Sequence, residues 1–304
     1  MKNLLAIAML ALTPMFAAAQ TFPSEQLQQV LIPGEDWKLA AQDLRSTDGP
    51  AANAKGEVFF NDGRSGKAMK IGLDGMVSSF VADTHRGAGQ AFGTDGRLYS
   101  AADATDQIIG YDADGKGTVF TDQLHGNDLT IAANGNMYVT QSPIKAEKVG
   151  KVWLVTPAGE KKLVDPAFSF PNGLALSPDQ RVLYVGDYRS HWVYSYAIQP
   201  DGSLGPKREF CNLFVPPTAK DSAADGIRVD SDGRLYVTTR SGIQVCDPAG
   251  KLLGIIPTPN GRVSNLTFGG ANFDVIYATC GDKIFARKVK VRGVKPFEAV
   301  PPKL

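Results

Sequence analysis

This chain of 304 residues contains few cysteines and few histidines, and its net charge is small. The cysteines and histidines, three of each, are Cys211, Cys246, Cys280, His85, His125 and His191. They are too few and too scattered for a disulfide framework or a short zinc motif. The net charge of +1, from 32 basic and 31 acidic residues, argues against general attraction to nucleic acid or an anionic membrane. A composition that is 43% hydrophobic and 21% charged indicates a folded globular protein.

Long apolar runs are also missing beyond the N-terminus, where a membrane-spanning helix would need roughly 18 consecutive apolar residues. The one run, over 4–15, follows a basic residue and ends at three alanines. This pattern predicts a signal peptide over 1–19, cleaved before Gln20; the alternative is a buried N-terminal helix. We therefore expect 20–304 to be exported, to a periplasm or outside the cell. Such a compartment permits a disulfide between two of the three cysteines, and the sequence leaves the pairing open.

One pattern recurs six times: an apolar strand, a turn rich in Asp, Asn and Gly, and a strand centred on an aromatic residue. The aromatic residues are Phe59, Tyr99, Tyr138, Tyr184, Tyr236 and Tyr277. Their successive spacings are 40, 39, 46, 52 and 41 residues, and each copy continues into a third alternating strand. Units of about 40 residues with three or four strands are typical of propeller blades. We therefore predict an all-β fold in which 20–304 form one six-bladed β-propeller domain. Two β-sandwiches would not explain six copies.

Polar residues occupy one register in five of the six repeats. Counting back eleven or twelve residues from each aromatic gives Asp48, Ala88, Asn127, Asn172, Asp225 and Asn265. The first strand of each propeller blade lines the central channel, so these ring residues would meet near one end of it. Converging carboxylate and amide oxygens suit a hard divalent cation. The alternative is that Asp and Asn simply favour turns and strand starts.

Three stretches carry a specific resemblance. They are FPNGLALSPDQRVLYVGDY at 170–188, ADGIRVDSDGRLYVTTRSGIQVCDPAGKLLGIIPTP at 224–259 and NLTFGGANFDVIYATC at 265–280. In this order and spacing they resemble the senescence marker protein/gluconolactonase/luciferin-regenerating enzyme family. The resemblance covers nearly all of the chain after the predicted signal peptide. It implies a six-bladed propeller with a divalent metal in the channel and, for characterised members, hydrolysis of sugar lactones.

The resemblance implies a metal site formed by Asp48, Asn172 and Asp225. Asn172 is the Asn of the family's PNGL, and Asp225 is the Asp of DG in the fifth repeat. Asp48 stands in DGP where the family usually has the Glu of EGP, so the charge is kept on a side chain one methylene shorter. Asp187 lies on the strand after Asn172. It would either hold the metal ligands in position or simply be a carboxylate whose hydrogen bonds are satisfied at the end of a strand.

The family's Arg-x-Asn-Asp motif, which contacts substrate, matches HGND at 125–128. The resemblance therefore implies a substrate-binding role for Asn127, while His125 stands where the family often has Arg. His125 is two residues before a ring residue and is expected to face the same pocket.

Together, the ring and the resemblance lead us to expect a metal-dependent hydrolase that opens a lactone ring. Asp225 would be both a metal ligand and the catalytic group that accepts a proton from the attacking water. The all-oxygen ligands favour calcium, with magnesium, manganese and zinc as the alternatives. Two other functions stay open: a phosphotriesterase or esterase on the same site, and a non-catalytic propeller that binds a ligand or protein partner. We expect a small-molecule lactone as partner, with no nucleic acid and no membrane span.

Overall fold

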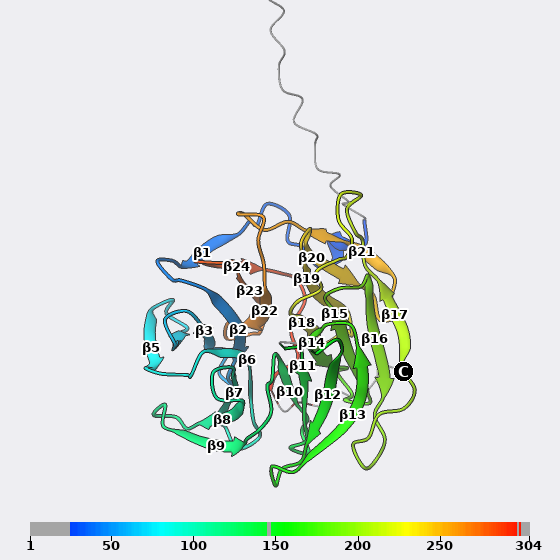
Figure 1. Cartoon of the computed structure of the whole chain (residues 1–304). Helices are drawn as coiled ribbons and strands as arrows, with labels where there is room; N and C mark the ends of the chain where they lie inside the picture. The colour runs from blue at the N-terminus through cyan, green and yellow to red at the C-terminus, as the bar shows by residue number, and fades with distance from the viewer. Residues whose placement is uncertain (1–24, 145–146, 297, 299–304) are drawn as a thin grey trace, which may run out of the picture.

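Six four-stranded antiparallel sheets surround a central channel in the computed structural model, which describes residues 25–144, 147–296 and 298 (Figure 1). The first three blades are β2–β5 (Thr47–Ala52, Val58–Asp62, Lys67–Ile71, Val77–Val81), β6–β9 (Gly87–Phe92, Leu98–Ala102, Gln107–Tyr111, Gly117–Thr121) and β10–β13 (Leu129–Ile131, Met137–Gln141, Gly150–Val155, Lys161–Phe168). The next two are β14–β17 (Pro171–Leu176, Val182–Asp187, Trp192–Ala197, Arg208–Asn212) and β18–β21 (Ile227–Val229, Leu235–Thr239, Gly242–Cys246, Leu252–Ile256). The predicted all-β, six-bladed propeller is confirmed.

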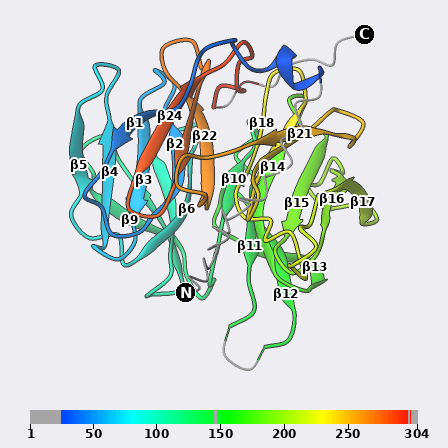
Figure 2. The ribbon, with the colours of Figure 1, turned by 90° about the horizontal axis from the view of Figure 1, so that it is seen from above.

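The sixth blade is built from both ends of the chain. It combines β22–β24 (Asn265–Gly269, Val275–Thr279, Ile284–Lys288) with β1 (Lys38–Ala41), which pairs antiparallel with β24 as the outermost strand. Figure 2 shows the blue β1 beside the red-orange β24. The N-terminal strand thus closes the ring of blades. One turn of 3₁₀ helix, η1 (Leu27–Gln29), precedes it.

Aspartate-containing turns separate the strands of the blades. The Asp112 carboxylate accepts backbone N–H bonds from Asp114 (3.0 Å) and Lys116 (2.9 Å). The Asp247 carboxylate does the same two and four residues further on. These carboxylates are therefore structural, as expected for Asp in tight turns.

The aromatic residue of each repeat packs between blades. Phe59 of the first blade meets Phe80 of its own outer strand and Phe92 of the second blade edge-on, with ring centroids 4.8 and 5.1 Å apart. Tyr236 and Phe268 join the fifth and sixth blades in the same way, at 5.1 Å. Such pairs bury large apolar areas. The apolar core therefore lies between the sheets, and the first strand of each blade lines the channel.

A disulfide joins the fourth and fifth blades. Cys211 on β17 is bonded to Cys246 on β20, and Cys280 is a free, buried thiol. The predicted signal peptide over 1–19 lies outside the described residues. Within the described ranges, no helix is long and apolar enough to cross a bilayer.

Candidate functional site

The six ring residues lie at one end of the channel, as their common register predicts. Asp48, Ala88, Asn172 and Asn265 lie on the first strands β2, β6, β14 and β22, while Asn127 and Asp225 lie two residues before β10 and β18. Backbone hydrogen bonds connect neighbouring first strands at this level: the Gly89 amide donates to the Asn127 carbonyl at 2.8 Å, and the Gly226 amide to the Ser264 carbonyl at 2.8 Å.

A glycine follows the ring residue in four blades, and two of these glycines explain how closely the strands approach. The Gly173 amide donates to the Asp225 carbonyl oxygen at 2.8 Å, and a Cβ on Gly173 would lie 2.1 Å from that oxygen. A Cβ on Gly226 would lie 2.2 Å from Oδ1 of Asn265. Any side chain at these positions would push the first strands apart and widen the ring.

Two predicted ligands, Asp48 and Asp225, are partly buried carboxylates that repel each other. Burial, followed by the charges of Asp48 and Asp128, raises the pKa of Asp225 well above its ordinary value, and a hydrogen bond from the Asn172 side chain opposes this. Burial also raises the pKa of Asp48, against a hydrogen bond from the Gly49 amide at 2.7 Å. A cation between these oxygens would relieve the repulsion.

The donor set fits a hard divalent cation. Asn172 is 7% exposed, and its amide contacts the Asp225 carboxylate, so an uncharged oxygen lies beside the charged ones. Among the described residues, no group of three His, Cys, Asp or Glu side chains is placed to hold a metal ion. A site here therefore depends on Asn172 together with Asp48 and Asp225, which is an oxygen-only set.

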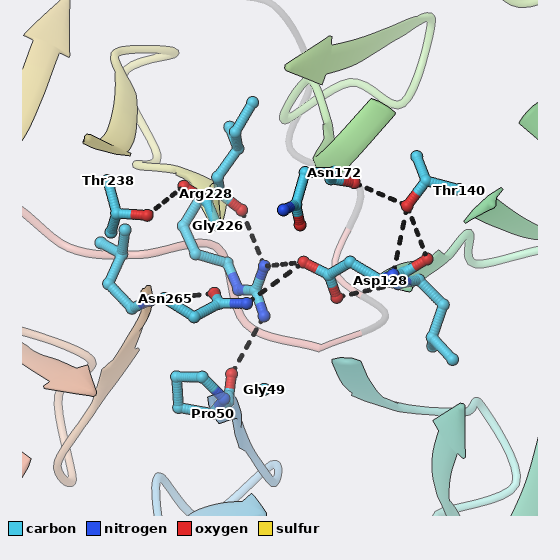
Figure 3. A network of polar contacts seen from close by, with 12 residues as sticks. Gly49, Pro50, Asp128, Thr140, Asn172, Gly226, Arg228, Thr238 and Asn265 are labelled. Atoms are coloured by element: carbon cyan, nitrogen blue, oxygen red, sulfur yellow. Dashed lines mark hydrogen bonds and ion pairs between the residues drawn. The ribbon is translucent and has the colours of Figure 1, made fainter. Parts of the chain in front are cut away.

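A buried ion pair, Asp128 with Arg228, lies deeper in the channel. Asp128 is 1% exposed, its Oδ2 is 3.8 Å from Nη1 of Arg228, and Asn265 donates to the same oxygen at 3.3 Å. Arg228 also donates to the Pro50 carbonyl of β2 at 3.0 Å, so it crosses between blades (Figure 3). Burial raises the pKa of Asp128 to about 6, even though Arg228 opposes the shift.

Neither Asp128 nor Arg228 is among the residues predicted for the site, although the sequence carries a signal for each. Arg228 interrupts the apolar strand Ile227–Val229, and Asp128 directly follows the ring residue Asn127. A charge inside a channel-lining strand needs a buried partner, which the structure supplies from another blade.

His125 and Asn127 line a cavity of about 340 Å³ together with Asp48, as the sequence led us to expect. We call it the His125 cavity. Nδ1 of His125 is 2.6 Å from Oδ1 of Asp106, and its Nε2 is 3.0 Å from Oδ1 of Asp103. Both ring nitrogens thus face carboxylates of the second blade. These contacts hold the imidazole in one orientation in the lining of the cavity. No described residue forms a hydrogen bond with the Asn127 side-chain amide.

Asp225 lines an adjoining cavity of about 520 Å³, the Asp225 cavity, whose wall also includes Tyr188. Asp48 lines both cavities. The structure therefore brings Asp48, Asn127, His125 and Asp225 to one mouth of the channel, with Asn172 in contact with Asp225.

Asp187 and its counterpart Asp62 hold the backbone that leads into two predicted ligands. Asp187 accepts N–H bonds from Ser169 (3.1 Å) and Phe170 (2.9 Å), three and two residues before Asn172. Asp62 accepts them from Arg45 (3.0 Å) and Ser46 (2.8 Å), at the same offsets before Asp48. Asp187 is therefore a support for the strand that presents Asn172 and not a ligand itself.

Residues 46–281, which include every ring residue, match the model of a family described as the SMP-30/Gluconolactonase/LRE-like region. The chain belongs to this family. The resemblance seen in the three sequence stretches is thereby confirmed.

Similarity to individual members extends over most of the chain. This chain is 27% identical over 283 residues to a gluconolactonase from Zymomonas mobilis, and the alignment covers 81% of this chain and 79% of that one. It is 27% identical over 263 residues to a diisopropyl-fluorophosphatase from Loligo vulgaris, covering 77% and 78%. The solved structure of a gluconolactonase from Xanthomonas campestris superposes with a TM-score of 0.76 and 26% identity, covering 88% of this chain and 94% of that one.

Proposed function

We propose that this chain is a divalent-cation-dependent hydrolase that opens a lactone ring. The observation that carries the proposal is the meeting of Asp48, Asn172 and Asp225 at a channel mouth where carboxylates repel each other. Relatives named gluconolactonase, aligned over about four fifths of the chain, support the substrate class. Asp48, Asn172 and Asp225 would hold the cation, and calcium is favoured by their all-oxygen character. When bound, such an ion would polarise the lactone carbonyl as a Lewis acid.

The chain's own residues supply binding and proton transfer. The Asn127 amide would hydrogen-bond a substrate oxygen in the His125 cavity, while His125, fixed by Asp103 and Asp106, shapes the wall. A carboxylate oxygen of Asp225 would take a proton from water as the water oxygen attacks the carbonyl carbon. The bond from that carbon to the ring oxygen breaks, and the proton passes to the ring oxygen. The product is the open hydroxy acid.

Cation binding is expected to stabilise the folded chain. Calcium at about 100–1,000 times its dissociation constant should raise the free energy of unfolding by about 3–4 kcal/mol, provided that it binds only the folded state. Denaturant unfolding with calcium and with chelator measures the difference. Replacing both carboxylates, in Asp48→Asn with Asp225→Asn, is the control and should abolish the gain. Equal stability of the native protein with and without the ion would contradict the proposal.

The same stabilisation should depend on pH. Without the cation, the folded-state pKa values of Asp48, Asp225 and Asp128 lie above their ordinary values, and that of Asp128 is about 6. The folded state therefore binds more protons than the unfolded state, and these groups cost stability as pH rises from the ordinary carboxyl value of about 4 through the Asp128 pKa of about 6. The cation must displace those protons. The gain in melting temperature on adding calcium should thus be larger at about pH 8 than at about pH 5, and the reverse order would contradict the assignment.

A substrate panel separates the lactonase from a second candidate. The relative named diisopropyl-fluorophosphatase favours hydrolysis of an organophosphorus ester at the same site as that second candidate. Purified protein should be assayed with aldonolactones, a simple aryl ester and a phosphotriester in the presence of calcium. The proposal expects turnover of a lactone above the other classes. Turnover of the phosphotriester alone would contradict the lactonase function and favour hydrolysis of organophosphorus esters instead.

We further propose that the chain is exported and cleaved before Gln20. The pairing of Cys211 with Cys246 supports this, because disulfides persist mainly in oxidising compartments. Expression of the full-length gene in a bacterium should give a periplasmic or secreted protein whose N-terminal sequencing begins at Gln20. A full-length product retained in the cytoplasm would contradict the proposal.

A further inference from the structure

Exposed arginines surround the channel mouth that holds the candidate site. Those that line the mouth and the groove beside it are Arg45, Arg64, Arg86, Arg240 and Arg262. The same cavities and groove are also lined by Asp48, Asp83, Asp103 and Asp225, so the charge that the arginines offer a ligand depends on which carboxylates they already pair with.

Two of the arginines at the mouth are already neutralised by carboxylates. Arg86 is 3.1 Å from the Asp103 carboxylate, and Arg240 pairs with Asp221. By contrast, no carboxylate of the described residues lies within ion-pair distance of Arg64 or Arg262. Arg262 acts on the Asp282 carboxylate only from a longer distance, and that carboxylate is paired with Lys283 at 2.9 Å. Both guanidinium groups therefore keep N–H donors for an anion from outside.

Arg64 and Arg262 lie on either side of Asp48. Arg64, just after β3, lines the His125 cavity, and Arg262, just before β22, lines the Asp225 cavity. Ser46 and Asp48 line both cavities, so the two arginines flank the place where a substrate would lie against the candidate ligands. A small molecule at Asp48 therefore has a free guanidinium beside it in each cavity.

The negative charges at this mouth would not cancel these arginines in the active protein. Asp48 and Asp225 would be balanced by the divalent cation of the proposed function, and Asp103 and Asp221 by their own arginines. A guanidinium presents paired N–H donors that match the two oxygens of a carboxylate or phosphate. A positively charged cleft also raises the rate at which anions arrive.

We infer that Arg64 and Arg262 recognise an anionic group, a carboxylate or phosphate, on the substrate. The inference rests on the proposed function and narrows it: the preferred lactone carries a negatively charged substituent outside its ring. Asn127 and the candidate ligands would contact the lactone itself, while one of the two arginines holds the charged end.

Matched lactone pairs test this inference. D-glucono-1,4-lactone and D-glucaro-1,4-lactone differ only by a carboxylate, and D-glucono-1,5-lactone and its 6-phosphate differ only by a phosphate. We expect kcat/KM to be about tenfold higher for the charged member of one pair at low ionic strength, the size of a charge-assisted hydrogen bond partly exposed to water. The preference should shrink as salt is added. The lactone pair that shows this preference identifies the recognised group as a carboxylate or a phosphate.

Arginine variants assign the preference to its residues. Arg64→Met combined with Arg262→Met should bring the charged-to-neutral ratio of kcat/KM close to one. Arg181→Met is the matched control, because Arg181 is exposed and has no ion pair among the described residues. It lies in the β14–β15 turn at the far end of the strand that carries Asn172. This control should retain the native ratio.

Melting temperatures with the same four compounds give a second readout that needs no turnover. If neutral lactones are hydrolysed as well as charged ones, the inference is wrong and the lactonase function stands. If no lactone is hydrolysed but charged compounds raise the melting temperature only when Arg64 and Arg262 are present, the lactonase function fails and the anion site stands. If charged compounds show no advantage in either readout, the inference is overturned.

Discussion

Asp225→Asn is expected to lower the rate of lactone hydrolysis by about 10²–10⁴-fold at saturating calcium. The substitution keeps the size of the side chain and one ligand oxygen, but removes the negative charge and the proton acceptor. Without the cation, burial and the charges of Asp48 and Asp128 raise the pKa of this carboxyl. A bound cation would lower that pKa again, so the carboxylate would be ionised and able to accept a proton from water. Weaker calcium binding by the variant should add to the loss at lower calcium concentrations.

Asn172→Asp is the matched comparison for this variant. It adds a negative charge and keeps an oxygen ligand, so it should retain calcium better than Asp225→Asn does. Both variants should fold, because the ring lies on the channel-facing first strands and the apolar packing lies between the blades. Calcium content, circular dichroism and kcat should be measured together. A folded, calcium-loaded Asp225→Asn protein with native activity would remove Asp225 from the chemistry.

Removal of the disulfide should lower the free energy of unfolding by about 4 kcal/mol, for a bridge that spans 35 residues. The pair joins the outer strand of the fourth blade to the third strand of the fifth, so it adds a covalent link between two sheets that otherwise meet through side-chain packing and hydrogen bonds such as that from the Gly173 amide to the Asp225 carbonyl. Urea unfolding of Cys211→Ala with Cys246→Ala, against the native protein, measures the effect.

A reductant tests the pairing itself. The native protein should fall to the stability of the double variant when reduced, and the double variant should not respond. Cys280→Ala removes the free thiol and should leave the response to the reductant intact. If Cys280→Ala abolished that response, the assignment of Cys211 to Cys246 would be wrong.

The fold was predictable because its units are local. Each blade is a run of hairpins whose turns and aromatic positions can be read within about 40 residues. The closure of the ring was not predictable in this way, because β1 pairs with β24 across almost the whole chain. The four residues at 38–41, Lys-Leu-Ala-Ala, show no alternation that would fix a partner, and only the missing fourth strand of the last blade selects one.

The candidate site was predictable to the extent that it repeats. Asp48, Asn172 and Asp225 stand at equivalent positions before the aromatic residue of their repeats, and this alone predicts that they lie at one level of the channel. Asp128 and Arg228 fall outside that register, so the counting could not find them. Their pairing depends on two strands from different blades facing each other across the channel, which is a property of the closed ring.

The contacts of His125 are also a product of tertiary structure. The sequence placed this residue at the pocket, and the structure shows it lining the His125 cavity. Its carboxylate partners, Asp103 and Asp106, come from the second blade, between β7 and β8. No local motif connects these positions, so the fixed orientation of the imidazole could not be foreseen.

Hydrolysis of D-glucono-1,5-lactone by one preparation, before and after removal of its divalent cations, decides whether the channel site needs a bound cation to open a lactone. Metal content should be measured on the freshly purified protein, on the chelator-treated protein and after calcium is restored. We expect about one bound divalent ion per chain, loss of lactone hydrolysis with the chelator, and recovery when calcium is restored. Full activity in a folded protein shown to contain no metal would contradict this expectation.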